Sequence, residues 1–136
     1  MINAAVAIFM AAILQGMPMR TVDKGLNSNI DGARQVVVRT ADEWTKLWTQ
    51  HAGERPRPSV DFNKEMVIAI FMGSRPSAAF TIEITGVEEQ AGMLVVSYKE
   101  TRPAPDRVAA QILTSPFHIV AVPKVGATEV KFEKVS

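Results

Sequence analysis

The sequence predicts a single α+β domain, in which one amphipathic helix packs on a mostly antiparallel, curved sheet or partial β-barrel. Its 136 residues suit one domain, and most of them divide into short apolar or alternating runs separated by turn residues, which is typical of strands. One segment, 40–52, carries a capped helical pattern. The links between the later strands are short, which favours antiparallel neighbours.

The helix is predicted from its cap and its apolar face. Thr40 is a suitable N-cap with Glu43 three residues later, and Gly53 ends the pattern. Four side chains recur at helical spacing and therefore share one face, which must cover a sheet. They are Trp44, Leu47, Trp48 and His51.

The strands follow from apolar runs. Residues 65–72 are apolar at consecutive positions, which predicts a central strand with the helix on one side. In 80–85 the apolar side chains alternate, so Phe80 is expected to begin an inward face. The segment 108–115 is ambiguous between a strand and a short helix. Further strands are expected from residue 19, and at 34–39, 93–101, 116–124 and 129–135. The predicted core contains Trp44, Leu47, Trp48, Phe62, Phe80 and Phe117.

The composition excludes several classes of function. The net charge is +1 and no basic run is present, so nucleic acid is not an expected partner. The chain has no cysteine, which excludes disulfides, thiolate metal sites and a cysteine nucleophile.

The first sixteen residues differ from the rest. Residues 2–14 form an apolar run that is too short to span a bilayer and has the length of a signal-peptide core. No Lys or Arg precedes the run, and "LQGMP" is a poor cleavage site, so a buried first helix or a misassigned start codon stays open. We expect residues 1–16 to be a signal peptide and residues 17–136 to form a periplasmic or secreted domain without a membrane span.

The sequence carries no catalytic motif. His51 and His118 are the only histidines, without a metal-ligand spacing, and Ser115 lacks the context of a nucleophile. No enzyme activity, cofactor or metal is predicted. A small enzyme or ligand carrier built around His51 or His118 remains an alternative.

Two proline-containing loops suggest a binding surface. If the strands 65–72, 80–85 and 93–101 form a meander, the loops 73–79 and 102–107 lie at the same end of the sheet. Prolines stiffen both loops, and arginine suits carboxylate recognition and interface anchoring. The alternative is that these residues only shape turns. The candidate partner-binding residues are Ser74, Arg75, Pro76, Ser77, Arg102, Pro103, Asp106 and Arg107.

The order of segments resembles the PrcB C-terminal domain family, which is named for a subunit of a bacterial secreted protease complex. The resemblance lies in "VVVRTADEWTKLW", "VDFNKEMVIAIFMGSRPSAAFTIEI" and "TSPFHIVAVPK", over roughly residues 34 to 132. One departure is Ala78-Ala79-Phe80, where the family tends to have Gly-Gly-Tyr. The resemblance implies an exported, non-catalytic domain that associates with a serine protease and supports its assembly or stability.

The sequence therefore predicts an exported, non-catalytic protein-binding domain, an accessory or stabilising subunit for a secreted protease. A weaker resemblance links the 73–79 loop to the "NPTTGY" loop of chagasin-like cysteine protease inhibitors, although this loop has no Asn. That resemblance implies the alternative of a protease inhibitor that uses the loops 73–79 and 102–107. A small-ligand-binding domain is the other alternative.

Overall fold

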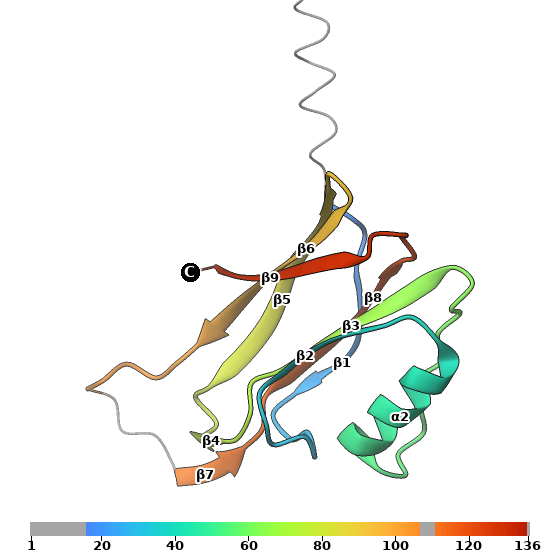
Figure 1. Cartoon of the computed structure of the whole chain (residues 1–136). Coiled ribbons are helices and arrows are strands. Elements are labelled where there is room, and N and C mark those ends of the chain that lie inside the picture. The colour runs from blue at the N-terminus through green and yellow to red at the C-terminus, as the bar shows by residue number, and fades with distance from the viewer. Residues whose placement is uncertain (1–15, 107–110, 136) are drawn as a thin grey trace, which may run out of the picture.

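A computed structural model describes residues 16–106 and 111–135, in which nine strands form three sheets and one helix packs on the largest of them (Figure 1). All paired strands are antiparallel except β6 and β9, which are parallel. The helix is α2 (Ala41–Ala52). The strands are β1 (Arg20–Gly25), β2 (Arg34–Val38), β3 (Glu65–Phe71), β4 (Arg75–Ser77), β5 (Thr81–Gln90), β6 (Met93–Thr101), β7 (Gln111–Thr114), β8 (Phe117–Pro123) and β9 (Glu129–Val135).

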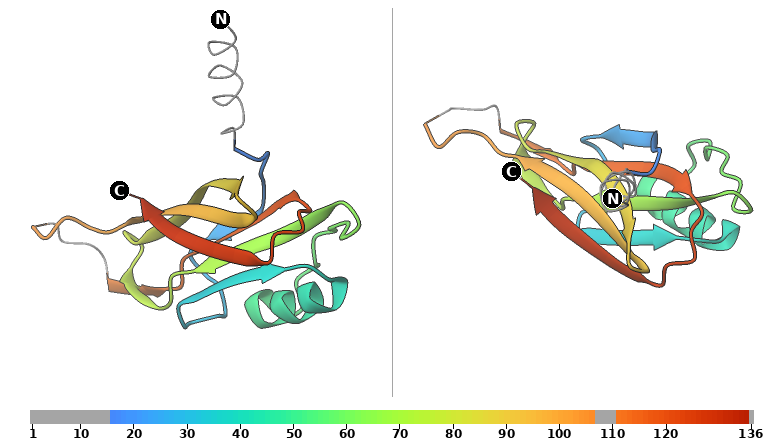
Figure 2. Two further views of the ribbon diagram at one scale, coloured as in Figure 1. Left: turned by 45° about the horizontal axis from the view of Figure 1, so that its top comes forward. Right: turned by 90° about the horizontal axis from the view of Figure 1, so that it is seen from above.

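The sheets have the orders β1-β8-β3-β2, β5-β6-β9 and β4-β7. The four-stranded and three-stranded sheets lie face to face, with α2 on the outer face of the larger one (Figure 2). The predicted α+β class is confirmed, and the sheets do not close into a barrel.

The central position of β3 follows from its sequence. Every residue from Met66 to Phe71 is buried, because α2 covers one face of the strand and the three-stranded sheet covers the other. β3 pairs along its whole length with β8, from Glu65 opposite Pro123 to Phe71 opposite Phe117. Successive side chains of these two strands therefore point alternately into two separate cores.

One core lies between the two larger sheets, and the other lies beneath the helix. The first contains Met66, Ile68, Ile70, Met72, Ile82, Ile84, Val87, Leu94, Val96, Val120, Val122 and Ala127. The second contains Ile30, Val38, Trp44, Leu47, Trp48, Val67, Ala69, Phe71, Phe117 and Ile119. Phe80 packs half-buried against the first core and Phe62 against the second, while the other four predicted core residues are fully buried.

The helix begins and ends as predicted. The Thr40 hydroxyl accepts a hydrogen bond from the Glu43 backbone N–H at 3.2 Å, and the Glu43 carboxylate accepts from the backbone N–H of Arg39. Gly53 ends the helix with φ 61°, a conformation that favours glycine. The indole N–H groups of Trp44 and Trp48 donate to backbone carbonyls of the connector that follows, so this connector is held against the helix.

The expected meander is wrong. β3 and β5 belong to different sheets, and residues 75–77 are not a simple turn between them, because they form β4 and pair with β7. The stretch "GSRPSAAF" therefore carries the chain from one sheet to the other. Gly73 permits the crossing, since it has φ 85° and a Cβ there would lie 3.1 Å from the Ala33 backbone N.

Two of the sequence predictions fall largely or wholly outside the described residues. They are the signal peptide at 1–16, of which only Gly16 is described, and the candidate binding residue Arg107. Within 16–106 and 111–135, no helix is long and apolar enough to cross a membrane.

Candidate functional site: a rim at one end of the sheets

The two proline-containing segments lie at the same end of the molecule, although the strands are not a meander. Thr81 at the start of β5 pairs with Thr101 at the end of β6, so the segment before β5 and the segment after β6 are neighbours. β4 and β7 lie at this end too (Figure 1). We call the exposed part of this end, residues 74–76, 102–106 and 111–113, the rim.

Most of the predicted binding residues are accessible at the rim. Ser74, Pro76, Arg102 and Asp106 are exposed, and Pro103 is half-buried. The guanidinium of Arg102 pairs with the Glu100 carboxylate at 3.0 Å, so part of its charge is already satisfied.

Ser77 differs from the other candidates because it is buried. Its hydroxyl accepts a hydrogen bond from the Ala79 backbone N–H, and its carbonyl accepts one from the Thr114 hydroxyl at 3.0 Å. Ser77 therefore fastens β4 to β7 and offers no group to a partner.

Sequence reasoning missed two exposed apolar residues of the rim. Ile112 is 56% exposed and Leu113 is 74% exposed, and both belong to β7. Neighbouring residues of a strand point to opposite faces, so both faces of β7 present an apolar side chain to solvent. The signal was the apolar pair in "QILT", three residues after a proline-rich loop.

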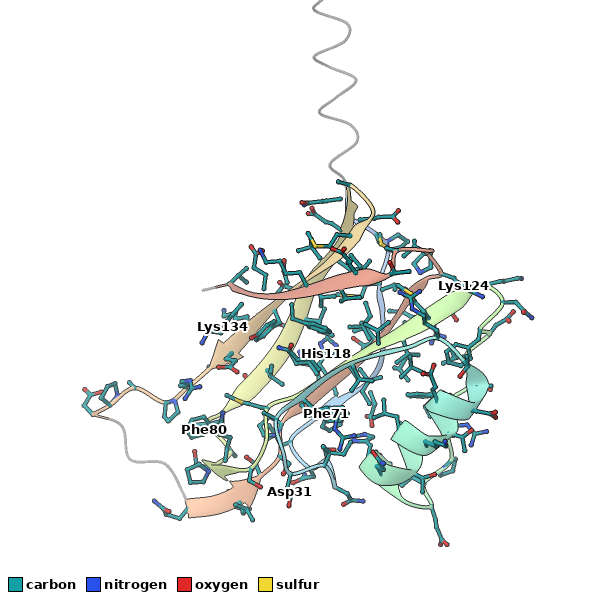
Figure 3. All side chains as sticks on the ribbon, viewed as in Figure 1. Asp31, Phe71, Phe80, His118, Lys124 and Lys134 are labelled. Atoms are coloured by element: carbon teal, nitrogen blue, oxygen red, sulfur yellow. The ribbon has the colours of Figure 1, made fainter. Side chains whose placement is uncertain are left out.

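Arg75 belongs to the rim, but its side chain is half-buried. Its Nε atom is buried and makes no hydrogen bond within the described residues, and its Nη1 lies 3.5 Å from the Ser74 carbonyl. The guanidinium carbon lies 5.8 Å from the centroid of the Phe80 ring, a weak cation–π contact. Figure 3 shows Phe80 at this end of the molecule.

Arg75 also lines an open pocket of about 300 Å³, which we call the Arg75 pocket. Arg34 and Gln35 of β2 and Tyr98 and Glu100 of β6 supply its other polar groups. Its apolar lining comes from the buried side chains of Ile70, Phe71, Met72 and Ile82, together with Ala33.

His51 is buried and both of its ring nitrogens are engaged. Nδ1 lies 2.7 Å from the Ser28 hydroxyl and Nε2 lies 2.8 Å from the Asp23 carboxylate. Burial lowers the pKa of His51, although the Asp23 carboxylate acts in the opposite direction. The neutral ring donates from Nε2 to Asp23 and accepts at Nδ1 from Ser28.

The order Ser28–His51–Asp23 has the residue types of a hydrolase triad but not its accessibility. The Ser28 hydroxyl is buried and also accepts the Ile30 backbone N–H at 3.0 Å. An open pocket of about 350 Å³ is lined by Asp23 and Arg55, but neither His51 nor Ser28 lines it. The arrangement fastens the loop before β2 to the helix and presents no nucleophile to a substrate.

His118 of β8 connects the sheets. Its Nδ1 accepts the Ile84 backbone N–H at 2.9 Å, and its Nε2 therefore carries the proton and donates to the Thr21 hydroxyl at 2.9 Å. Ile84 begins the bulge of β5, so the ring satisfies a backbone group at an interrupted ladder. Burial lowers the pKa of His118 to about 4. Figure 3 shows the residue in the interior.

Neither histidine belongs to a metal site in the part of the chain that the structure describes. There, no three His, Asp or Glu side chains come close enough together to hold a metal ion. The rim and the Arg75 pocket are thus the candidate functional site, and the histidines hold the fold together.

The comparisons with known proteins give one match, to a family model. No curated protein and no solved structure matches this chain. The family model described as PrcB C-terminal matches residues 66–123, less than half of the 136 residues. The matched segment runs from β3 to the end of β8 and includes the whole rim, whereas β1, β2, α2 and β9 lie outside it. Over β3–β8 the chain is therefore similar to the PrcB C-terminal family, in agreement with the resemblance seen in the sequence.

Proposed function

We propose that this protein is an exported, non-catalytic protein-binding domain, an accessory or stabilising subunit of a secreted protease complex, and that the rim contacts its partner. The family match suggests a domain associated with a protease complex. The apolar segment at the start of the sequence supports export.

One observation carries the proposal: the consecutive residues Ile112 and Leu113 are both exposed, one on each face of the short β4–β7 ribbon. Burial of both side chains in an interface would contribute roughly 3 kcal/mol from the area removed from water. Both residues lie in the segment that the family model matches.

The rim is also rigid enough to bind without a large ordering cost. β4 is paired with β7, Ser77 and Thr114 are hydrogen-bonded across the ribbon, and prolines restrict the backbone at residues 76 and 103. A surface that is ordered before binding loses less conformational entropy on association.

The inhibitor and enzyme alternatives have less support. An inhibitor would need to insert the 73–79 segment into a protease cleft, but the backbone of residues 75–77 is already paired with β7. An enzyme built on His51 or His118 would need a ring nitrogen that faces a substrate, and each histidine uses both nitrogens inside the fold.

The experiment is affinity capture with a matched control. The immobilised chain is exposed to envelope and secreted fractions of its source cell, and retained proteins are identified by mass spectrometry. We expect retention of a protease subunit that is reduced at least tenfold by the double substitution Ile112→Ser and Leu113→Ser. The control is Val135→Ser, which changes an apolar residue of 37% exposure on β9.

Three outcomes contradict the proposal. Equal retention by the double variant and the wild type would remove the rim as the contact, and retention of no protease-complex component would remove the proposed partner. Inhibition of a member of a protease panel by the chain would favour the inhibitor alternative instead.

A further inference from the structure

We propose that the Arg75 pocket binds the C-terminal carboxylate of an extended peptide segment, with the side chain of that last residue on the apolar lining. The inference rests on the proposed function, because the protein partner supplies the segment. It adds the chemistry of the group that is recognised.

The pocket has an excess of positive charge. Neither Arg34 nor Arg75 makes a salt bridge within the described residues; Arg34 donates to the neutral Gln50 amide at 2.7 Å. Glu100, the one acid that lines the pocket, is instead 3.0 Å from Arg102 and 3.6 Å from Lys134.

No other acidic side chain of the described residues pairs with either arginine. Residues 1–15, 107–110 and 136 contain no Asp or Glu. The buried Nε of Arg75 adds a donor without an acceptor in the described structure. A carboxylate is the group that a guanidinium binds with two parallel hydrogen bonds, so a ligand carboxylate fits this donor set.

A small apolar surface lies next to these cations, on side chains that are at most 2% exposed. Phe71, Met72 and Ile82 line the same pocket of about 300 Å³. A ligand that fills the pocket therefore joins a carboxylate to an apolar group at short range. The C-terminal residue of a peptide has this composition, whereas an Asp or Glu side chain ends in the carboxylate alone.

The direction of β2 also suits a peptide that ends in the pocket. It is the edge strand of the four-stranded sheet, and it begins at Arg34 in the pocket and runs away to Val38. An extended segment added antiparallel to this edge would run toward Arg34 and end at the pocket. Strand addition with capture of a terminal carboxylate is an established form of peptide recognition, and β2 has the polarity for it.

The test uses small probes and the whole chain, observed by ¹H–¹⁵N NMR. The probe is N-acetyl-phenylalanine, and its amide, N-acetyl-phenylalaninamide, is the matched control without the carboxylate. We expect saturable shifts at the Arg75 Nε–H and at the backbone amides of Arg34, Met72 and Tyr98, with a dissociation constant on the order of 1 mM for so small a ligand. The amide probe should leave these signals unchanged.

Two substitutions locate the site. Arg75→Gln should weaken the probe at least tenfold, whereas Arg57→Gln, which changes an exposed arginine of the connector between α2 and β3, should leave binding unchanged. The dispersion of the amide spectrum shows whether each variant is folded. If Arg75→Gln is not folded, Arg34→Gln serves as a second test of the pocket.

Several outcomes overturn the inference. Equal binding of the acid and amide probes would exclude carboxylate recognition. Equal shifts with inorganic phosphate would indicate a general anion site, and tighter binding of the α-amide of N-acetyl-glutamate would indicate an acidic side chain instead of a C-terminus. If no probe binds while capture still depends on Ile112 and Leu113, the inference about the pocket is wrong and the proposed function stands. If the probes bind as expected but capture fails, the proposed function is wrong and the pocket stands.

Discussion

The two histidines show how single buried residues connect segments that are distant in the sequence. His118 joins β8 to β5 and β1 through its two ring nitrogens, and His51 joins α2 to Asp23 and Ser28. In both rings the hydrogen-bond partners suit the neutral form. A buried ring in such a network makes the fold sensitive to protonation.

Acid should destabilise the protein through His118. Its pKa is about 4 in the fold, below the usual 6.5, so between these values the unfolded chain binds a proton that the folded chain does not. The stability is therefore complete above pH 6.5 and falls toward pH 4, by about 3 kcal/mol from this residue. Urea unfolding from pH 7.5 to pH 4.5 measures the decrease.

The matched variant is His118→Asn, whose side-chain oxygen still accepts the Ile84 N–H but does not titrate. Its free energy of unfolding should fall less steeply with acid than that of the wild type. The lowered pKa of His51 acts in the same direction in both proteins, so the difference between the two profiles isolates His118. Parallel profiles would show that the fold does not lower the pKa of His118.

The hydrogen-bond partners of His51 and His118 could not be predicted from the sequence, for a physical reason. His118 and Thr21 are separated by 97 positions, and His51 and Asp23 by 28. Periodicity reports which face of an element is buried, and it placed His51 correctly on the apolar face of the helix. It carries no information on which polar group from another element meets a side chain there.

Among the elements, the helix was the most predictable because its signals are local. The cap, the buried face and the terminal glycine all lie within residues 40–53, and each has the predicted role. A strand such as β3 was also predictable, since consecutive burial leaves a continuous apolar run.

The cap gives a prediction at this scale. Thr40→Ala should lower the free energy of unfolding by about 1 kcal/mol, because the first turn of α2 loses the acceptor for the Glu43 N–H. Denaturant unfolding measures it. The control is Thr45→Ala, whose hydroxyl bonds the Ala41 carbonyl within the helix; there alanine should be neutral or stabilising. A loss at Thr45 equal to that at Thr40 would contradict the assignment of the cap.

The short strands of the rim were not predictable as a pair. β4 has three residues and β7 has four, and their pairing joins Arg75 to Thr114 across the intervening hairpin of β5 and β6. Runs of this length give no periodic signal. The common position of the two proline-containing loops was nonetheless anticipated, because one hairpin returns the chain to the same end whether or not β3 joins that sheet.

For the molecule as a whole, the edge strands β2 and β9 determine how the two larger sheets are held together. No ladder joins these edges, and the half-buried side chains of Val37, Val130 and Phe132 pack on the core from either side. At one end the Arg75 pocket opens between the sheets. At the other end the Arg39 guanidinium, from the residue after β2, donates to the carbonyls of Val125 and Ala127 just before β9.

Arg39 should therefore stabilise the attachment of β9 to the rest of the fold. Arg39→Met keeps most of the apolar stem but removes both bonds to backbone carbonyls, so the free energy of unfolding should fall by about 2 kcal/mol. The substitution should accelerate native-state hydrogen exchange more in β9 than in β3 and β8, because β3 and β8 are covered on both faces.

The control for this variant is Arg34→Met at the other end of β2, where the guanidinium bonds only the exposed Gln50 side chain. That change should alter stability by less than about 0.5 kcal/mol, as is usual for exposed positions. If Arg39→Met and Arg34→Met unfold alike and β9 exchanges as in the wild type, the sheets are held by their apolar contacts alone. A selective loss of protection in β9 would instead show that the bonds of Arg39 to the carbonyls of Val125 and Ala127 hold the start of β9 against the rest of the fold.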